Sequence, residues 1–138
     1  FGEKDAQQCL VIEKMVHDLN IRTKILKVPT VREQDGLAIS SRNMYLSKPE
    51  RDSATIIYKS LSLAHELHSQ GIKNASFIKN SMSELINSVP FTKQDYISVS
   101  EPSTLKELDL IDCDALISVA VFVGKTRLID NIYLKSID

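Results

Sequence analysis

The chain has 138 residues, of which 43% are hydrophobic and 25% are charged. This composition is typical of a globular protein and argues against a disordered chain. Seventeen basic and 18 acidic residues give a formal net charge of −1, so the basic excess of a nucleic-acid-binding protein is missing. The sequence contains no apolar run of membrane-spanning length and no secretory signal pattern, so neither nucleic acid nor a membrane is an expected partner.

The first 46 residues predict a helix followed by a strand. Asp5 is placed to cap a helix that runs to about Asn20, with a broad apolar face at helical spacing. The β-branched run at 23–28 predicts a strand, which ends at Pro29 because proline cannot donate to a sheet ladder. Helix and strand in this order are the end of an α/β unit. Because the first residue is not methionine, we expect a piece of a longer protein.

Residues 47–138 predict a separate α+β domain. Ser47 and Glu50 match a capping box, and apolar residues at helical spacing then predict one helix up to Gly71. Asn74 begins a second helix. Three strands are expected at 95–101, 116–123 and 126–134, the last two joined by a tight Gly-Lys turn.

Cysteine and histidine spacing indicates no metal site. Cys9 and Cys113 belong to no Cys-x-x-Cys or Cys/His pattern. We interpret both as free thiols of a cytoplasmic protein, with a disulfide as the alternative. His65 and His68 stand three apart on a predicted helix, a spacing that suits a metal pair, but we expect them and His17 at the surface.

The segment at 28–43 is the stretch most suggestive of chemistry. It reads Val-Pro-Thr-Val-Arg-Glu-Gln-Asp-Gly-Leu-Ala-Ile-Ser-Ser-Arg-Asn, with a turn signal at Asp35-Gly36. The hydroxyls of Ser40 and Ser41 and the forked cation of Arg42 suit phosphate oxygens, and the glycine favours a mobile loop. On composition alone, a solvated linker between two domains is the better-supported alternative.

The opening residues allow two interpretations. In the structural one, Asp5 caps the helix and Lys4 is solvated. In the functional one, the helix N-terminus and Lys4 attract a phosphate, and Asp5 accepts from ribose hydroxyls. Gln8, one turn later, carries an amide that suits a small polar substrate, or it is simply an exposed helical glutamine. The spacing does not decide between them.

Three blocks resemble the pantoate–β-alanine ligases (pantothenate synthetases). The segment at 28–43 reads close to the family's Pro-Thr-Val-Arg-Glu-x-Asp-Gly-Leu-Ala-Met-Ser-Ser-Arg-Asn. The opening Phe-Gly-Glu-Lys-Asp-Ala-Gln-Gln is similar to the family's Phe-Gly-Glu-Lys-Asp-x-Gln-Gln. Residues 124–131, Gly-Lys-Thr-Arg-Leu-Ile-Asp-Asn, resemble its Thr-Arg-Leu-Ile-Asp-Asn. The blocks lie in the family's order and the resemblance spans essentially the whole chain.

The resemblance implies an ATP-dependent ligase that condenses pantoate with β-alanine through pantoyl adenylate, releasing AMP and pyrophosphate with the help of Mg²⁺. Residues 1–46 would then be the end of a Rossmann-like α/β ATP-binding domain with its phosphate loop, and 47–138 an α+β lid domain of helices on an antiparallel sheet. Gln8 is implied to bind pantoate. The residues implied to be catalytic are Lys4, Ser40, Ser41 and Arg42. The residues implied to bind ATP are Gly2, Glu3, Lys4, Asp5, Val31, Ile39, Ser40, Ser41 and Arg42.

The chain departs from the family pattern in two respects. Ile39 stands where many members have methionine, a change of similar volume that leaves adenine packing intact. The family's His-x-Gly-His motif is absent from these 138 residues. We therefore expect this chain alone to be inactive and the full enzyme to be a homodimer through its other half. The alternative is that residues 47–138 form an independent binding or interaction domain without catalysis.

Overall fold

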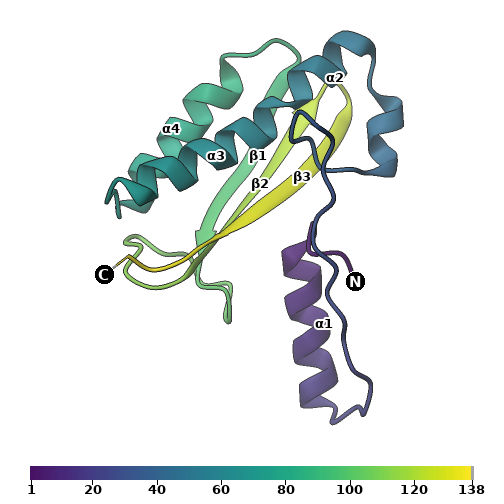
Figure 1. The fold of residues 1–138 in the computed structure, drawn as a ribbon, viewed down its shortest axis with the longest axis vertical. Coiled ribbons are helices and arrows are strands. Elements are labelled where there is room, and N and C mark those ends of the chain that lie inside the picture. Colours follow the sequence, from purple (N-terminus) through teal and green to yellow (C-terminus); the bar gives the residue numbers. More distant parts are fainter. Residues whose placement is uncertain (138) are drawn as a thin grey trace.

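The computed structural model describes residues 1–137 as an α+β protein. Its three strands form an antiparallel sheet in the order β1-β2-β3. Helices α3 and α4 cover one face of this sheet, whereas α1 and the extended chain after it project away from it (Figure 1). The elements are α1 (Ala6–Asp18), the 3₁₀ helix η1 (Ser41–Tyr45), α2 (Lys48–Ala54), α3 (Ile56–Ser69), α4 (Ala75–Asn87), β1 (Thr92–Ser100), β2 (Ala115–Val123) and β3 (Thr126–Leu134).

The hairpin of β2 and β3 confirms the predicted tight turn and sets which side chains face the core. Val119 pairs with Asp130, and Ser118 pairs with Asn131. Val119 belongs to the core between the sheet and the helices. Because side chains alternate along a strand, Asp130 lies on the helix-covered face and Asn131 on the opposite face. The largest fully buried core side chains include Ile57, Leu61, Ile78, Met82, Ile86, Ile117, Val119 and Val121.

The helix expected between Ser47 and Gly71 is in fact two helices. The predicted capping box of Ser47 and Glu50 is present at the start of α2. However, α2 ends at Ala54 and α3 begins at Ile56. The hydroxyl of the intervening Thr55 donates to the carbonyl of Asp52 at 2.9 Å. The backbone N–H of Thr55 donates to the same carbonyl at 3.4 Å, an i→i−3 bond that tightens the helix here. The apolar periodicity continues across Thr55 and does not reveal this break.

The α1 helix begins as predicted, but its apolar face is not packed. Asp5 accepts from the backbone N–H of Gln8 at 3.0 Å and so caps the helix. Only Ala6 and Cys9 of α1 are buried. The exposed apolar side chains of this helix include Val11 and Met15.

The predicted strand at 23–28 is wrong. Val28 forms only an isolated parallel bridge with Gly2, and the residues before it have no regular structure. Extended backbone becomes a strand only when neighbours complete its ladder. Among the described residues, this segment pairs with no strand of the sheet and runs beside α1 (Figure 1).

One expectation for the histidines is also wrong. His68 is 3% exposed, and its Nε2 and Nδ1 lie 3.0 Å and 3.3 Å from the carbonyl oxygens of Lys135 and Ile72. Its position on the buried face of α3, with backbone carbonyls in reach, accounts for this burial. Cys9 and Cys113 are free thiols, as predicted. Within residues 1–137, no helix is long and apolar enough to cross a membrane.

Candidate functional site

The segment predicted as a mobile loop contains a short hairpin. The N–H of Ile39 donates to the carbonyl of Val31, and the N–H of Glu33 to that of Leu37, both at 2.9 Å. Gly36 makes the turn with a φ of +91°, where a Cβ would overlap the ring of Tyr58. Glycine is therefore required at this turn both by its backbone angle and by the closeness of α3.

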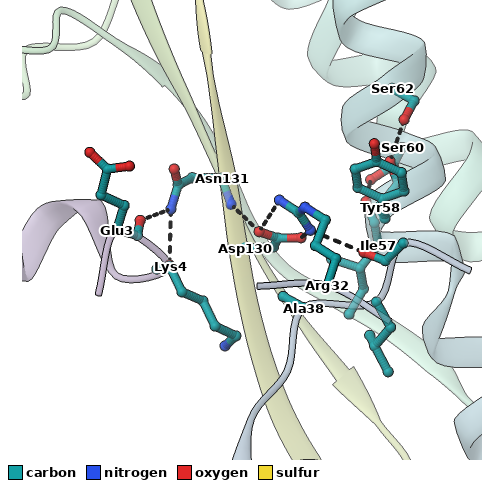
Figure 2. Close-up of polar contacts among 12 residues, drawn as sticks. Glu3, Lys4, Arg32, Ala38, Ile57, Tyr58, Ser60, Ser62, Asp130 and Asn131 are labelled. Carbon is teal, nitrogen blue, oxygen red and sulfur yellow. Dashed lines mark hydrogen bonds and ion pairs between the residues drawn. The ribbon is translucent and has the colours of Figure 1, made fainter. Parts of the chain in front are cut away.

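Arg32 anchors this hairpin to β3 (Figure 2). Its Nη1 and Nη2 donate to the two carboxylate oxygens of Asp130 at 2.5 Å and 3.0 Å. The same Nη1 donates to the carbonyl of Gly36 at 3.1 Å, and the guanidinium lies 4.5 Å from the centre of the Tyr58 ring. The Asp130 side chain is only 2% exposed. A bidentate, desolvated pair of this kind fixes both distance and orientation.

Asn131 holds the opening turn from the other face of β3. Its Nδ2 donates to the carbonyls of Glu3 and Lys4, both at 2.9 Å. Figure 2 shows β3 passing between Asn131, which points toward these residues, and Asp130, which points toward Arg32. The turn before α1 and the hairpin at 31–39 thus meet at two consecutive residues of one strand.

Lys4 is half-buried where these segments meet. Burial lowers the pKa of its ammonium, and the charge of Arg42 acts in the same direction, while the carboxylate of Asp130 opposes both. Lys4 lines two small recesses, each of which also includes Asp130 and Ile129. A partly desolvated ammonium near a second cation favours binding of an anion.

Arg42 extends the positive surface along the start of η1. Ser40 caps η1 by accepting from the N–H of Arg42 at 3.2 Å. The Nη1 of Arg42 donates to the carbonyl of Arg127 at 3.2 Å. Together with Tyr45 and Lys125, these two arginines line an open pocket of about 470 Å³, in which Arg127 also donates to the carboxylate of Asp95 at 2.8 Å. Arg42 is exposed, which leaves its remaining donors accessible to a ligand.

The structure brings most, but not all, of the predicted site residues together. The Gly2–Lys4 turn meets β3, and the 31–39 hairpin continues into Ser40, Ser41 and Arg42. Val31 and Ile39 are 62% and 49% exposed, so their apolar side chains are available to a ligand. Gln8 is exposed and lines neither Lys4 recess, whereas its neighbour Gln7 lines one of them.

Sequence reasoning missed three residues of this arrangement: Arg32, Asp130 and Asn131. The only available signal was that Arg32 lies in the resembled block at 28–43, and Asp130 and Asn131 in the one at 124–131. The pairing of Arg32 with Asp130 joins residues 98 positions apart, which no local pattern encodes.

Taken together, the fold and these contacts define an α+β protein with a surface of cations and hydroxyls at one edge of its sheet, the candidate site for an anion. Lys4 and Arg42 supply the charge, and the hydroxyls of Ser40 and Ser41 supply short donors, a donor set that suits phosphate groups. Among residues 1–137, no cluster of three or more His, Cys, Asp or Glu is placed to hold a metal ion.

Comparison with known proteins identifies the family. A family model described as Pantoate-beta-alanine ligase matches residues 1–133. A pantothenate synthetase of Caldicellulosiruptor bescii is 51% identical over 136 residues, which are 99% of this chain and 48% of that protein. One from Clostridioides difficile is 53% identical over 131 residues, 95% of this chain and 46% of that protein. The chain therefore belongs to the pantoate–β-alanine ligase family.

Solved structures agree with this assignment. The pantothenate synthetase of Thermus thermophilus superposes with a TM-score of 0.89 at 41% identity, covering 96% of this chain and 48% of that one. The Francisella tularensis enzyme, complexed with beta-gamma ATP and beta-alanine, gives a TM-score of 0.63 at 32% identity over 95% of this chain and 41% of that one. The chain spans about half the length of the curated relatives it matches.

Proposed function

We propose that this chain is the C-terminal part of an ATP-dependent ligase that condenses pantoate with β-alanine to give pantothenate. Family membership supports the reaction class, and the relative complexed with beta-gamma ATP and beta-alanine supports the substrates. The observation that carries the proposal is the meeting of the Lys4 turn and the Arg42 segment at β3. In this proposal, the two cations and the hydroxyls of Ser40 and Ser41 bind one triphosphate.

The proposed reaction has two steps. A carboxylate oxygen of pantoate attacks the α-phosphorus of ATP, the bond from that phosphorus to the bridging oxygen breaks, and pyrophosphate leaves. The amine of β-alanine then attacks the carbonyl carbon of pantoyl adenylate, loses a proton and displaces AMP. The chain needs no nucleophile of its own for either step. Its task is to align the reactants and to stabilise negative charge on the departing pyrophosphate.

The proposed roles follow from where each group lies. Lys4 and Arg42 bind the phosphates, and Ser40 and Ser41 donate to the same oxygens. The exposed apolar side chains of Val31 and Ile39 pack on the nucleoside. The remaining ATP contacts are proposed for Gly2, Glu3 and Asp5, and the pantoate contact for Gln8.

Mg²⁺ enters this proposal as part of its substrate, MgATP. Magnesium in such enzymes is commonly held by substrate phosphates with one or two carboxylates. Near Lys4, the Asp130 carboxylate already accepts from Arg32, and Asp5 caps α1. Phosphate oxygens are therefore the main proposed ligands of the ion, which neutralises charge on the leaving pyrophosphate.

We also propose a division of labour within the whole protein. Residues 1–46 complete a Rossmann-like ATP-binding domain, 47–138 act as its lid, and the protein works as a homodimer in the cytoplasm. The exposed apolar face of α1, which includes Val11 and Met15, supports this view because such a face is stabilised when further protein covers it. The 138-residue chain alone, without a His-x-Gly-His motif, is expected to be inactive.

Pantoate-dependent exchange of pyrophosphate into ATP, measured on the full polypeptide that contains this chain, tests the proposal. Loss of one preorganised donor costs about 10²–10³-fold in rate. Lys4→Ala and Arg42→Ala should therefore each slow the exchange by at least about a hundredfold. Lys14→Ala is the matched control, because Lys14 is an exposed α1 lysine that, among the described residues, pairs with Asp18 alone.

Three outcomes would contradict the proposal. Absence of pantoate-dependent exchange in the parent polypeptide would reject the function itself. A loss similar to that of the Lys14 control would remove Lys4 or Arg42 from its assigned role. Rapid exchange by the isolated 138-residue chain would show that the described residues hold a complete site.

A further inference from the structure

We propose that Asp130 and Asn131 are positioning residues, which hold Lys4 and the Arg42 segment at a fixed separation from the two faces of β3. The inference rests on the proposed function, because it assigns these two residues a part in arranging the ATP site. Neither is required to touch the substrate. Together they attach two segments to a single dipeptide, in addition to the backbone bridge between Gly2 and Val28 that joins the same two segments.

The register of the sheet directs the two side chains to opposite faces. Asp130 stands opposite Val119 and Asn131 opposite Ser118, so their side chains leave β3 on opposite faces. β3 is the last strand in the order β1-β2-β3. At such an edge, the N–H of Asn131 donates to the Asp130 carboxylate at 2.9 Å. This bond ties the orientation of the carboxylate to the strand itself.

Asp130 lies on the helix-covered face. Asp130 accepts both terminal nitrogens of Arg32, and Arg32 in turn donates to the carbonyl of Gly36 and lies on the Tyr58 ring. The arginine therefore joins the strand, the hairpin turn and α3. The hairpin closes at Ile39, which leads directly into Ser40 and the cations beyond it. Because the pair is bidentate and its carboxylate is buried, the hairpin has little freedom to shift while the pair is intact.

Asn131 lies on the opposite face. An asparagine amide has two N–H donors, and the carbonyls of Glu3 and Lys4 accept from this one nitrogen at equal distances of 2.9 Å. Two carbonyls in succession define the direction of the backbone at Lys4. The contact with β3 therefore helps to fix the position of the Lys4 side chain, in addition to the start of α1.

Electrostatics give the arrangement a measurable signature. The charged groups that face Lys4 are Asp130 and Asp5, which raise its pKa, and Arg42 and Arg32, which lower it together with burial. Replacing Asp130 with asparagine removes a negative charge and leaves the positive charge of Arg32 unbalanced. Both changes shift deprotonation of Lys4 to lower pH. This shift reports that Asp130 lies near Lys4, whereas the positioning role itself is tested by kcat.

The test measures pyrophosphate exchange, as a function of pH, for Asp130→Asn and Asn131→Asp in the full polypeptide. Asn131→Asp is nearly isosteric but replaces the donor amide with a carboxylate that repels two carbonyl oxygens. Displacement of a reacting group by about 1 Å costs on the order of a hundredfold in rate. We therefore expect kcat to fall by at least about tenfold in both variants, with native circular dichroism. In Asp130→Asn, the alkaline limb of the profile moves to lower pH.

The matched control is Asp114→Asn. Asp114, like Asp130, accepts from a cation and from a backbone N–H, those of Lys135 and Ser136, but beyond the far end of β3. The Asp114→Asn variant should retain the parental kcat and the parental alkaline limb of the pH profile. Arg32→Lys, which keeps the charge but loses the bidentate geometry, should lie between the parent and Asp130→Asn.

Folding failure would not leave the inference untested. If Asp130→Asn does not fold, Asn131→Asp decides by its kcat alone. Values of kcat within about twofold of the parent, or a loss equal to that of Asp114→Asn, would overturn the positioning role while leaving the proposed function standing. Absence of exchange in the parent would instead reject the proposed function and, with it, this inference.

Discussion

Replacing Gly36 with alanine should destabilise the protein through two separable effects. Gly36 has a φ of +91°, and its added Cβ would overlap Cδ1 of Tyr58 and lie 2.7 Å from Cγ. The left-handed backbone costs an alanine about 1–2 kcal/mol. Forcing an additional methyl group into packed surroundings costs about 1–3 kcal/mol. The free energy of unfolding should therefore fall by about 2–5 kcal/mol, the sum of the two effects.

Gly71 provides a matched control for the backbone effect. Its φ is +93°, close to that of Gly36, but a Cβ there would meet no atom within 4 Å. Gly71→Ala should therefore cost only the backbone share, about 1–2 kcal/mol. The difference between the two variants in urea denaturation measures the contact of the hairpin turn with α3.

A double-mutant cycle with Tyr58→Ala completes the experiment. Once the ring is removed, Gly36→Ala should cost no more than Gly71→Ala, because only the backbone effect remains. Equal costs for Gly36→Ala with and without the ring would refute the reasoning. The reasoning would also be refuted if, in the parent background, Gly36→Ala lowered the free energy of unfolding by no more than Gly71→Ala does.

Two further predictions use groups whose pKa is shifted. A hydrogen bond from Arg51, reinforced by the N–H of Leu37, lowers the pKa of Asp35 below its ordinary 3.8 despite partial desolvation. The stability from this exposed pair is present above that ordinary pKa and is lost as the pH falls through the lowered pKa. Asp35→Asn should therefore lower the free energy of unfolding by less than about 1 kcal/mol at neutral pH, and by still less in acid. A cost that grows in acid would contradict this sign. Burial raises the pKa of the Cys9 thiol, which donates to a backbone carbonyl, so a thiol reagent at neutral pH should label Cys113 first. Mass spectrometry of the labelled peptides measures the two rates, and faster labelling of Cys9 than of Cys113 would contradict this prediction.

The parts of the fold that follow from short-range chemistry could be predicted from the sequence. The caps at Asp5, Ser47 and Asn74 and the turn between β2 and β3 depend on residues within one turn of one another. The local pattern was misleading where the backbone leaves a regular ladder. The helix tightens into an i→i−3 bond at Thr55, and the extended segment at 23–28 pairs with no strand among the described residues.

The candidate site could be predicted only in part for the same reason. Lys4, Ser40 and Arg42 were indicated by residue type and by the family resemblance. Arg32 and Asp130 are as central to the arrangement, but an arginine in a turn-rich segment and an aspartate in a strand carry no sign that they will pair. Their roles become visible only when the sheet register places Asp130 on the face where the hairpin docks.

The central claim is that Lys4 and Arg42 bind the phosphates of one ATP molecule. A crystal structure of the full polypeptide with pantoate and a non-hydrolysable MgATP analogue tests it most directly. The account predicts Nζ of Lys4 and a guanidinium nitrogen of Arg42 within about 2.7–2.9 Å of phosphate oxygens of the same nucleotide. A nucleotide bound with its phosphates in contact with neither cation would contradict the claim.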